Sequence, residues 1–146
     1  MKLVKIFKVL GDETRIRIVN LLRNSELCVC EITYALGATQ SNISKHLAKL
    51  SDSDFVVSSK KAQWISYKIN PALLAEYPFI QTILNQEMTK IPQCQEDLAK
   101  LAECQSRGIP LMKRHISSSV LRFPLKPSPN RAYSNTLREP WRRGQL

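Results

Sequence analysis

The sequence lacks any run of about 18 apolar residues, and Lys5 and Lys8 interrupt the apolar N-terminus MKLVKIFKV. A membrane-spanning helix needs roughly 20 apolar residues, and a signal peptide needs an uninterrupted apolar centre. We therefore expect a cytoplasmic protein with no membrane partner. The chain has 146 residues and no internal repeat, so it is about one domain long and too short for a multidomain enzyme.

Acidic residues are scarce near the C-terminus. Residues 107–146 contain 9 Lys and Arg against 1 acidic residue, whereas residues 1–106 contain 13 against 11. The C-terminal segment also holds 5 of the 8 prolines, and its apolar residues keep no regular period. We predict a disordered basic tail over 107–146. It would either add non-specific attraction to phosphates or be a dispensable extension.

Helical spacing of apolar residues marks the first 50 positions. One helix is predicted over residues 3–10, and Asp12 is a suitable N-cap for a second that ends near Asn24. A third helix of about two turns ends at Gly37, and Thr39 caps a fourth. Two helices joined by a short turn that contains glycine form a helix-turn-helix.

The fourth helix has two different faces. At about 100° per residue, Ile43, Leu47 and Leu50 share one face, and the opposite face is small, hydroxylic and cationic. Such a face fits the major groove of DNA. The predicted DNA contacts of this helix are Gln40, Ser41, Ser44, Lys45, His46 and Lys49. His46 flanks the core face, where packing or phosphate binding is favoured over metal ligation.

A β-hairpin is predicted over residues 55–69, because apolar and polar residues alternate from 65 to 69. Its tip carries Lys60 and Lys61, which suit the DNA backbone beside the groove. The tip has no Gly or Asn, so the type of turn stays open.

Two further helices are predicted after the hairpin. The first begins near residue 71, is interrupted at Pro78 and ends at Pro92, and its broad apolar face is expected to pair with the first helix and with a second subunit. Packing within one subunit is the alternative. A final short helix is predicted around residues 96–105.

Four segments carry a family resemblance: GDETRIRIVNLL from position 11, ELCVCEI from 26, QSNISKHLAKL from 40, and WISYKIN from 64. Together, over roughly residues 3–91, they resemble the ArsR/SmtB family of metalloregulatory winged-helix repressors. ELCVC followed by QSxxSxHL is similar to the arsenical-sensing branch, in which cysteines bind trivalent arsenic or antimony and DNA is released. The segment SDSDF at 51–55 departs from the small-Gly-Leu turn usual in the family.

The resemblance implies an α+β, mainly α fold: a dimeric winged helix-turn-helix with a two-stranded wing over residues 1–92, then a cysteine-containing helix over 93–106. It implies a repressor that is not an enzyme. Such a protein binds two-fold operator DNA as a homodimer without a cofactor, and As(III) or Sb(III) acts as its inducer.

The four cysteines are the candidate metal ligands, because thiolates select soft ions. On an ideal helix Cys28 and Cys30 project about 200° from one another, so joint binding requires the helix start to distort. In arsenical sensors with three neighbouring cysteines, the third falls at Thr33. A third thiolate would have to come from Cys94 or Cys104, in the same or the partner subunit. One continuous helix would hold these two about 15 Å apart, so one of them would complete a given site. The alternative is that both are half-buried thiols without a ligand role.

Several alternatives stay open. The same fold with a cadmium or redox response is one, and a winged helix reduced to protein interaction is another. A thiol oxidoreductase is disfavoured because no His or Lys adjoins Cys28 or Cys30 in the sequence. The family's zinc site of Asp, His and Glu is not expected, since residues 81–90 contain Glu87 but no His.

Overall fold

The computed structural model describes residues 1–61 and 64–107, with the backbone alone for Lys61, so the predicted tail lies outside the described residues beyond Arg107. The helices are α1 (Lys2–Leu10), α2 (Glu13–Leu22), α3 (Val29–Leu36), α4 (Gln40–Asp52), α5 (Pro71–Glu76), α6 (Pro78–Thr82) and α7 (Pro92–Ser106). The strands are β1 (Leu27–Cys28), β2 (Val56–Lys61) and β3 (Trp64–Ile69). A π-helical turn, η1 (Ile83–Glu87), and a 3-10 turn, η2 (Met88–Lys90), join α6 to α7.

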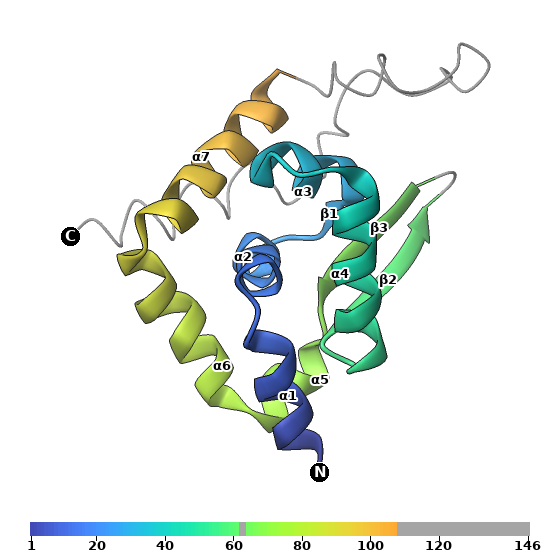
Figure 1. Cartoon of the computed structure of the whole chain (residues 1–146), viewed down its shortest axis with the longest axis vertical. Coiled ribbons are helices and arrows are strands. Elements are labelled where there is room, and N and C mark those ends of the chain that lie inside the picture. The colour runs from blue at the N-terminus through green and yellow to red at the C-terminus, as the bar shows by residue number, and fades with distance from the viewer. Residues whose placement is uncertain (62–63, 108–146) are drawn as a thin grey trace.

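Helix α2 occupies the centre of the fold. It lies between α7 on one side and α4 on the other, and it also contacts α3 (Figure 1). Its residues Ile18, Val19 and Leu21 are fully buried. Burial of each such side chain contributes about 1.5–3 kcal/mol relative to exposure, so α2 organises the core.

The predicted N-caps Asp12 and Thr39 and the predicted end of the third helix at Gly37 are confirmed, whereas that helix begins at Val29, after Cys28. The Asp12 side chain accepts a hydrogen bond from Arg15 N at 3.0 Å, and Thr39 Oγ1 accepts one from Asn42 N at 3.3 Å. Gly37 follows α3 with φ +63°, the left-handed geometry that glycine adopts without strain. The turn between α3 and α4 is therefore encoded by a glycine and an N-cap.

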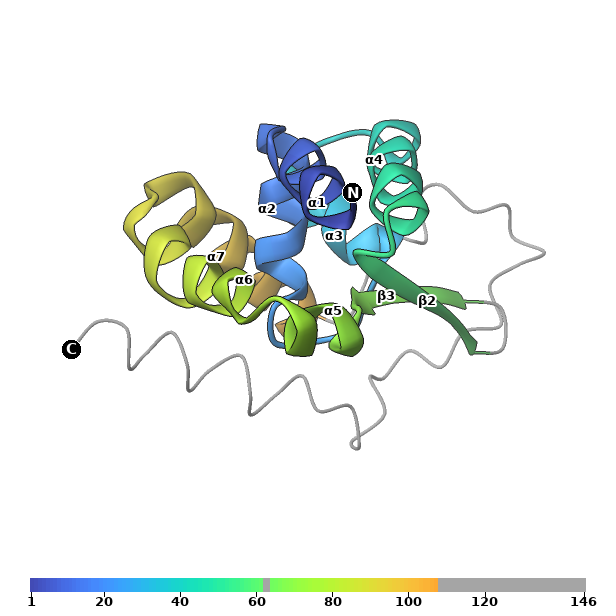
Figure 2. The same cartoon turned by 90° about the horizontal axis from the view of Figure 1, so that it is seen from below.

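The predicted wing is present as the antiparallel hairpin of β2 and β3, which extends away from the helices (Figure 2). A third strand, which the sequence analysis did not predict, completes the sheet in the order β1-β3-β2. In β1, Leu27 pairs with Tyr67 and Cys28 pairs with Ser66. The wing is thus joined directly to the segment that carries the first cysteine.

The last helix begins earlier than predicted. The preceding helical stretch ends at Lys90, close to Pro92 as predicted. Pro92 itself occupies the first turn of α7, where its missing N–H costs nothing. Before it, Phe79 of α6 stacks on Phe7 of α1 with ring centroids 5.7 Å apart, which joins the late helices to the first helix as expected. None of the helices over residues 1–61 and 64–107 combines the length and apolarity that crossing a membrane requires.

Candidate DNA-binding surface and thiol site

The two faces predicted for α4, one apolar and one polar, are buried and exposed as the spacing predicts. Ile43, Leu47 and Leu50 are buried in the core. Of the predicted DNA contacts, those exposed to solvent are Gln40, Ser41, Ser44, Lys45, Lys49 and, on β2, Lys60. Three of these are cations on two neighbouring elements, a distribution that suits a polyanion.

His46 differs from the other predicted contacts of α4 because its side chain is largely buried. Its side chain is 15% exposed, and Nδ1 lies 3.6 Å from Asp12 Oδ1, at the N-cap of α2. The pKa of Asp12 is lowered: burial opposes its charged form, but the backbone N–H of Arg15 and the charges of Arg15 and His46 favour the carboxylate more. His46 therefore lies against the N-terminus of α2, with Nδ1 too far from Asp12 Oδ1 for a hydrogen bond.

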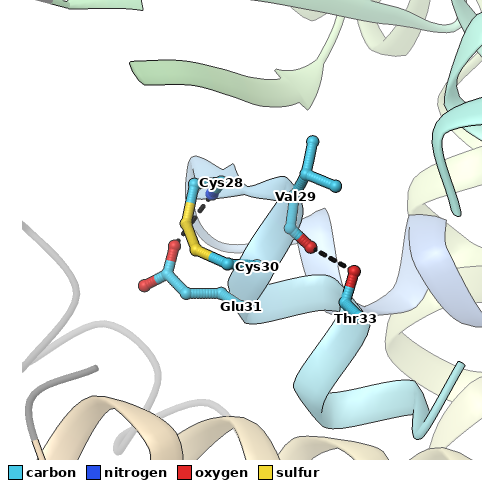
Figure 3. Close-up of a disulfide and its surroundings, with 5 residues drawn as sticks. All are labelled: Cys28, Val29, Cys30, Glu31 and Thr33. Carbon is cyan, nitrogen blue, oxygen red and sulfur yellow. Dashed lines mark hydrogen bonds between the residues drawn. A yellow bond between two sulfur atoms is a disulfide. The ribbon is translucent and has the colours of Figure 1, made fainter. Parts of the chain in front are cut away.

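Cys28 and Cys30 lie together at the start of α3 (Figure 3). Cys28 is the N-cap and has extended backbone angles, φ −83° and ψ 162°, whereas Cys30 lies in the first helical turn. Their Cα atoms are 5.5 Å apart and their sulfurs form a disulfide. The expectation that the helix start must distort before both sulfurs can meet is wrong, because Cys28 precedes the helix and pairs with β3.

A buried carboxylate borders this thiol pair. Glu31 is 2% exposed, and its Oε2 accepts a hydrogen bond from the backbone N–H of Cys28 at 2.8 Å (Figure 3). Thr33, at the family's third cysteine position, donates its hydroxyl to the carbonyl of Val29 at 2.7 Å. Thr33 thus stabilises the first turn of α3, and Glu31 fixes the backbone at Cys28.

Cys104 and Cys94 lie at opposite ends of α7. Cys104 is buried on the part of α7 that packs against α3, and burial, followed by the charges of Glu31 and Glu103, raises the pKa of its thiol to about 11. Burial, followed by the charge of Asp97, also raises the pKa of Cys94.

The surroundings of Cys94 belong to α2, since its backbone carbonyl accepts a hydrogen bond from Asn20 at 3.5 Å. Over the part of the chain that the structure describes, no three His, Cys, Asp or Glu side chains stand close enough to hold a metal ion. A site with three thiolates therefore requires a movement of α7 or a cysteine from a second subunit.

One polar cluster was missed by the sequence analysis. The Glu26 carboxylate accepts hydrogen bonds from the hydroxyls of Ser59 and Ser66, which belong to the wing. These residues lie 33 and 40 positions from Glu26. A local spacing pattern cannot detect such distant partners, and only the register of β1 against β3 would have indicated them.

Comparison with known proteins identifies the domain. The family model described as "Bacterial regulatory protein, arsR family" matches residues 12–58. The arsenic resistance transcriptional regulator ArsR1 of Pseudomonas putida is 45% identical over 67 residues, which is 45% of this chain and 52% of that protein. The chain thus spans about half the length of ArsR1.

Two further matches cover more of the matched protein. The arsenical resistance operon repressor of Staphylococcus aureus is 33% identical over 73 residues, 50% of this chain and 70% of the repressor. The structure of HlyU from Vibrio cholerae superposes with a TM-score of 0.50 at 30% identity, over 56% of this chain and 90% of HlyU. The names of the two sequence relatives describe a transcriptional regulator and a repressor rather than enzymes. The helix-turn-helix of α3 and α4, the wing and these matches together show that the chain belongs to the arsR family of bacterial regulatory proteins.

Proposed function

We propose that this protein is a homodimeric transcriptional repressor that binds two-fold operator DNA and leaves it when trivalent arsenic or antimony binds its cysteines. The observation that carries the proposal is the meeting of the Cys28 and Cys30 sulfurs at the start of α3. Helix α3 continues through Gly37 into α4, the helix with the exposed cationic face. A ligand held at the thiol pair therefore acts on the helix-turn-helix itself.

The chemistry of the pair fits this inducer. In the reduced protein, three thiols and one molecule of As(OH)₃ form As(SR)₃ and three molecules of water, so each arsenic–oxygen bond is replaced by an arsenic–sulfur bond. Sulfur ligands are soft and prefer such centres to Mg²⁺ or Ca²⁺. Both sulfurs of Cys28 and Cys30 are already within reach of one atom.

Cys104 is the better third ligand within one subunit. It lies on α7 where that helix packs on α3, and the charge of Glu31 acts on its thiol. Cys94 lies about 15 Å farther along α7, by the rise of a helix, where its backbone carbonyl accepts a hydrogen bond from Asn20 of α2. Sulfurs that share one ion must approach within roughly 4 Å of one another. Ligation would therefore draw α7 toward the start of α3 and shift α3 relative to α4.

The proposed dimer uses α1 and the late helices. Three apolar side chains of α1 are between 37% and 56% exposed: Leu3, Val4 and Phe7. The ring of Phe7 stacks on that of Phe79 in α6, so the apolar surface extends from α1 to α6. Contiguous exposed apolar side chains of this kind indicate an interaction surface. A second copy that covers them would place two α4 helices for two half-sites about one DNA turn apart.

A redox-responsive repressor is the second candidate, because Cys28 and Cys30 form a disulfide. With a peroxide as oxidant, two thiols and one hydrogen peroxide give one disulfide and two molecules of water. The same two sulfurs cannot then bind arsenic. Oxidation and metalloid binding are thus competing fates of one pair.

The test is an operator gel shift with an arsenite titration. Cys28→Ser and Cys30→Ser should retain operator binding and lose release by arsenite, and serine preserves the N-cap at position 28. Cys94→Ser is the matched control and should respond like the wild type. A normal arsenite response in either of the first two variants would falsify the proposal.

Mass spectrometry separates the inducers. Purified reduced protein is treated in parallel with arsenite, cadmium and peroxide. Addition of one arsenic with loss of three protons indicates three thiolate bonds, and loss of two protons without added mass indicates a disulfide. Cadmium retention without arsenic addition would favour the cadmium-responsive alternative.

A further inference from the structure

The first cysteine and the wing are linked by a row of side chains across the sheet. Cys28 of β1 pairs with Ser66 of β3, and Ser66 pairs with Ser59 of β2. Directly paired residues of antiparallel strands point to the same face, so these three residues lie in line across all three strands. The next position along β2 is Lys60, a predicted DNA contact.

Glu26 joins two residues of this row through hydrogen bonds. It lies two residues before Cys28, and its Oε1 accepts hydrogen bonds from the hydroxyls of both Ser59 and Ser66. The two hydroxyls are themselves 3.0 Å apart. Hydrogen bonds to a charged carboxylate are stronger than those between neutral groups, so the end of β1 and both strands of the wing are held as one unit.

We propose that Glu26, Ser59 and Ser66 are positioning residues that carry inducer binding from the thiol pair to the wing. This inference rests on the proposed function. Ligation ties the sulfur of Cys28 to that of Cys30 and fixes the backbone where β1 becomes α3. Because Ser66 pairs with Cys28 and shares Glu26 with Ser59, a shift of β1 turns the hairpin and moves Lys60 relative to the DNA backbone.

The test is a comparison of two serine variants in the full chain. The double variant Ser59→Ala/Ser66→Ala removes both hydroxyls from Glu26. Ser58→Ala is the matched control, because Ser58 is an exposed neighbour on the opposite face of β2. Operator dissociation constants are measured with and without arsenite, and their ratio gives the coupling between the two sites.

In the wild type and in Ser58→Ala, arsenite should weaken operator binding by roughly 5- to 150-fold. In the double variant this ratio should fall by about 2- to 30-fold, while mass spectrometry shows the same arsenic content. An unchanged ratio overturns the role of the wing and leaves the proposed function standing. Absence of any arsenite effect in the wild type overturns both.

A second measurement needs no DNA. The chain has 2 tryptophans, and Trp141→Phe leaves Trp64, the first residue of β3, as the reporter of the wing. Arsenite should change its fluorescence in this background and in combination with Ser58→Ala, but not with Ser59→Ala/Ser66→Ala. Should the double variant fail to fold, the single variants Ser59→Ala and Ser66→Ala take its place, each with a smaller loss of the fluorescence change expected. An equal fluorescence change in all proteins contradicts the proposal.

Discussion

Arg17 of α2 and Asp97 of α7 form a two-point ion pair in which Nε and Nη2 each lie 2.8 Å from a carboxylate oxygen. Asp97 is fully buried, and Gln93 donates a further hydrogen bond to its Oδ1 at 3.3 Å. The planar guanidinium matches the carboxylate geometry, which fixes the angle between the two helices. The helix that carries Cys104 is therefore attached to the central helix of the core.

Loss of this pair should destabilise the fold strongly. Arg17→Met leaves the Asp97 carboxylate buried without its cation, and we expect a loss of about 3–5 kcal/mol in the free energy of unfolding, measured by urea denaturation. Glu13→Gln removes the other acidic partner of Arg17, which is 83% exposed and 3.9 Å away, and should change stability by less than about 1 kcal/mol. Equal effects of the two substitutions would show that burial of Asp97 does not determine the cost.

Lys45 should contribute to operator affinity through phosphate charge. Lys45→Ala is expected to weaken operator binding and to reduce the slope of log K against log salt by about 0.9 for each phosphate that the lysine neutralises. Lys100→Ala is the control, since Lys100 is also an exposed lysine and lies on α7, across α2 from α4 (Figure 1). An unchanged slope for Lys45→Ala removes this residue from the DNA contacts.

Local signals predicted the helices and the hairpin, because caps, glycine and apolar spacing act within a few residues. The turn of the helix-turn-helix was predicted correctly from Gly37, which ends α3, and Thr39, which caps α4. Strand β1 was missed since two residues show no period. As a result, Cys28 was placed on a helix, and the prediction that its side chain projects away from that of Cys30 was wrong.

Contacts between distant positions were beyond the sequence analysis for the same reason. Arg17 and Asp97 are 80 positions apart, and no local spacing pattern links the two. The early start of α7 at Pro92 was missed because proline both ends and begins helices. The Arg17–Asp97 contact and the start of α7 depend on how the helices pack against one another in the folded chain.

Gly37→Ala tests whether the turn between α3 and α4 requires a left-handed backbone conformation at this position. A Cβ at this position meets no atom within 4 Å, so the substitution creates no clash and isolates the cost of φ +63°. We expect a loss of roughly 1–2 kcal/mol, seen as a fall in Tm of about 2–4 °C per kcal/mol. Gly37→Asn should cost less, because asparagine tolerates this region. An unchanged Tm in Gly37→Ala would show that the turn adopts a different backbone conformation without cost.

The thiol of Cys104 should make stability depend on pH in the alkaline range. Its pKa is raised from an ordinary value near 9 to about 11 in the folded protein, chiefly by burial. Between these values the unfolded chain releases a proton that the folded chain keeps. Stability is therefore unaffected by this group below about pH 9 and should fall by about 2–3 kcal/mol as the pH approaches 11.

Cys104→Ala isolates this effect, because lysines, tyrosines and Cys94 titrate equally in both proteins. The variant starts from a lower stability, since a small buried side chain is shortened. Its free energy of unfolding, measured by urea denaturation under reducing conditions, should fall less steeply between pH 9 and 11 than that of the wild type. Parallel curves would mean that the Cys104 thiol titrates in the folded protein as it does in the unfolded chain, in which case burial against α3 does not hold its proton.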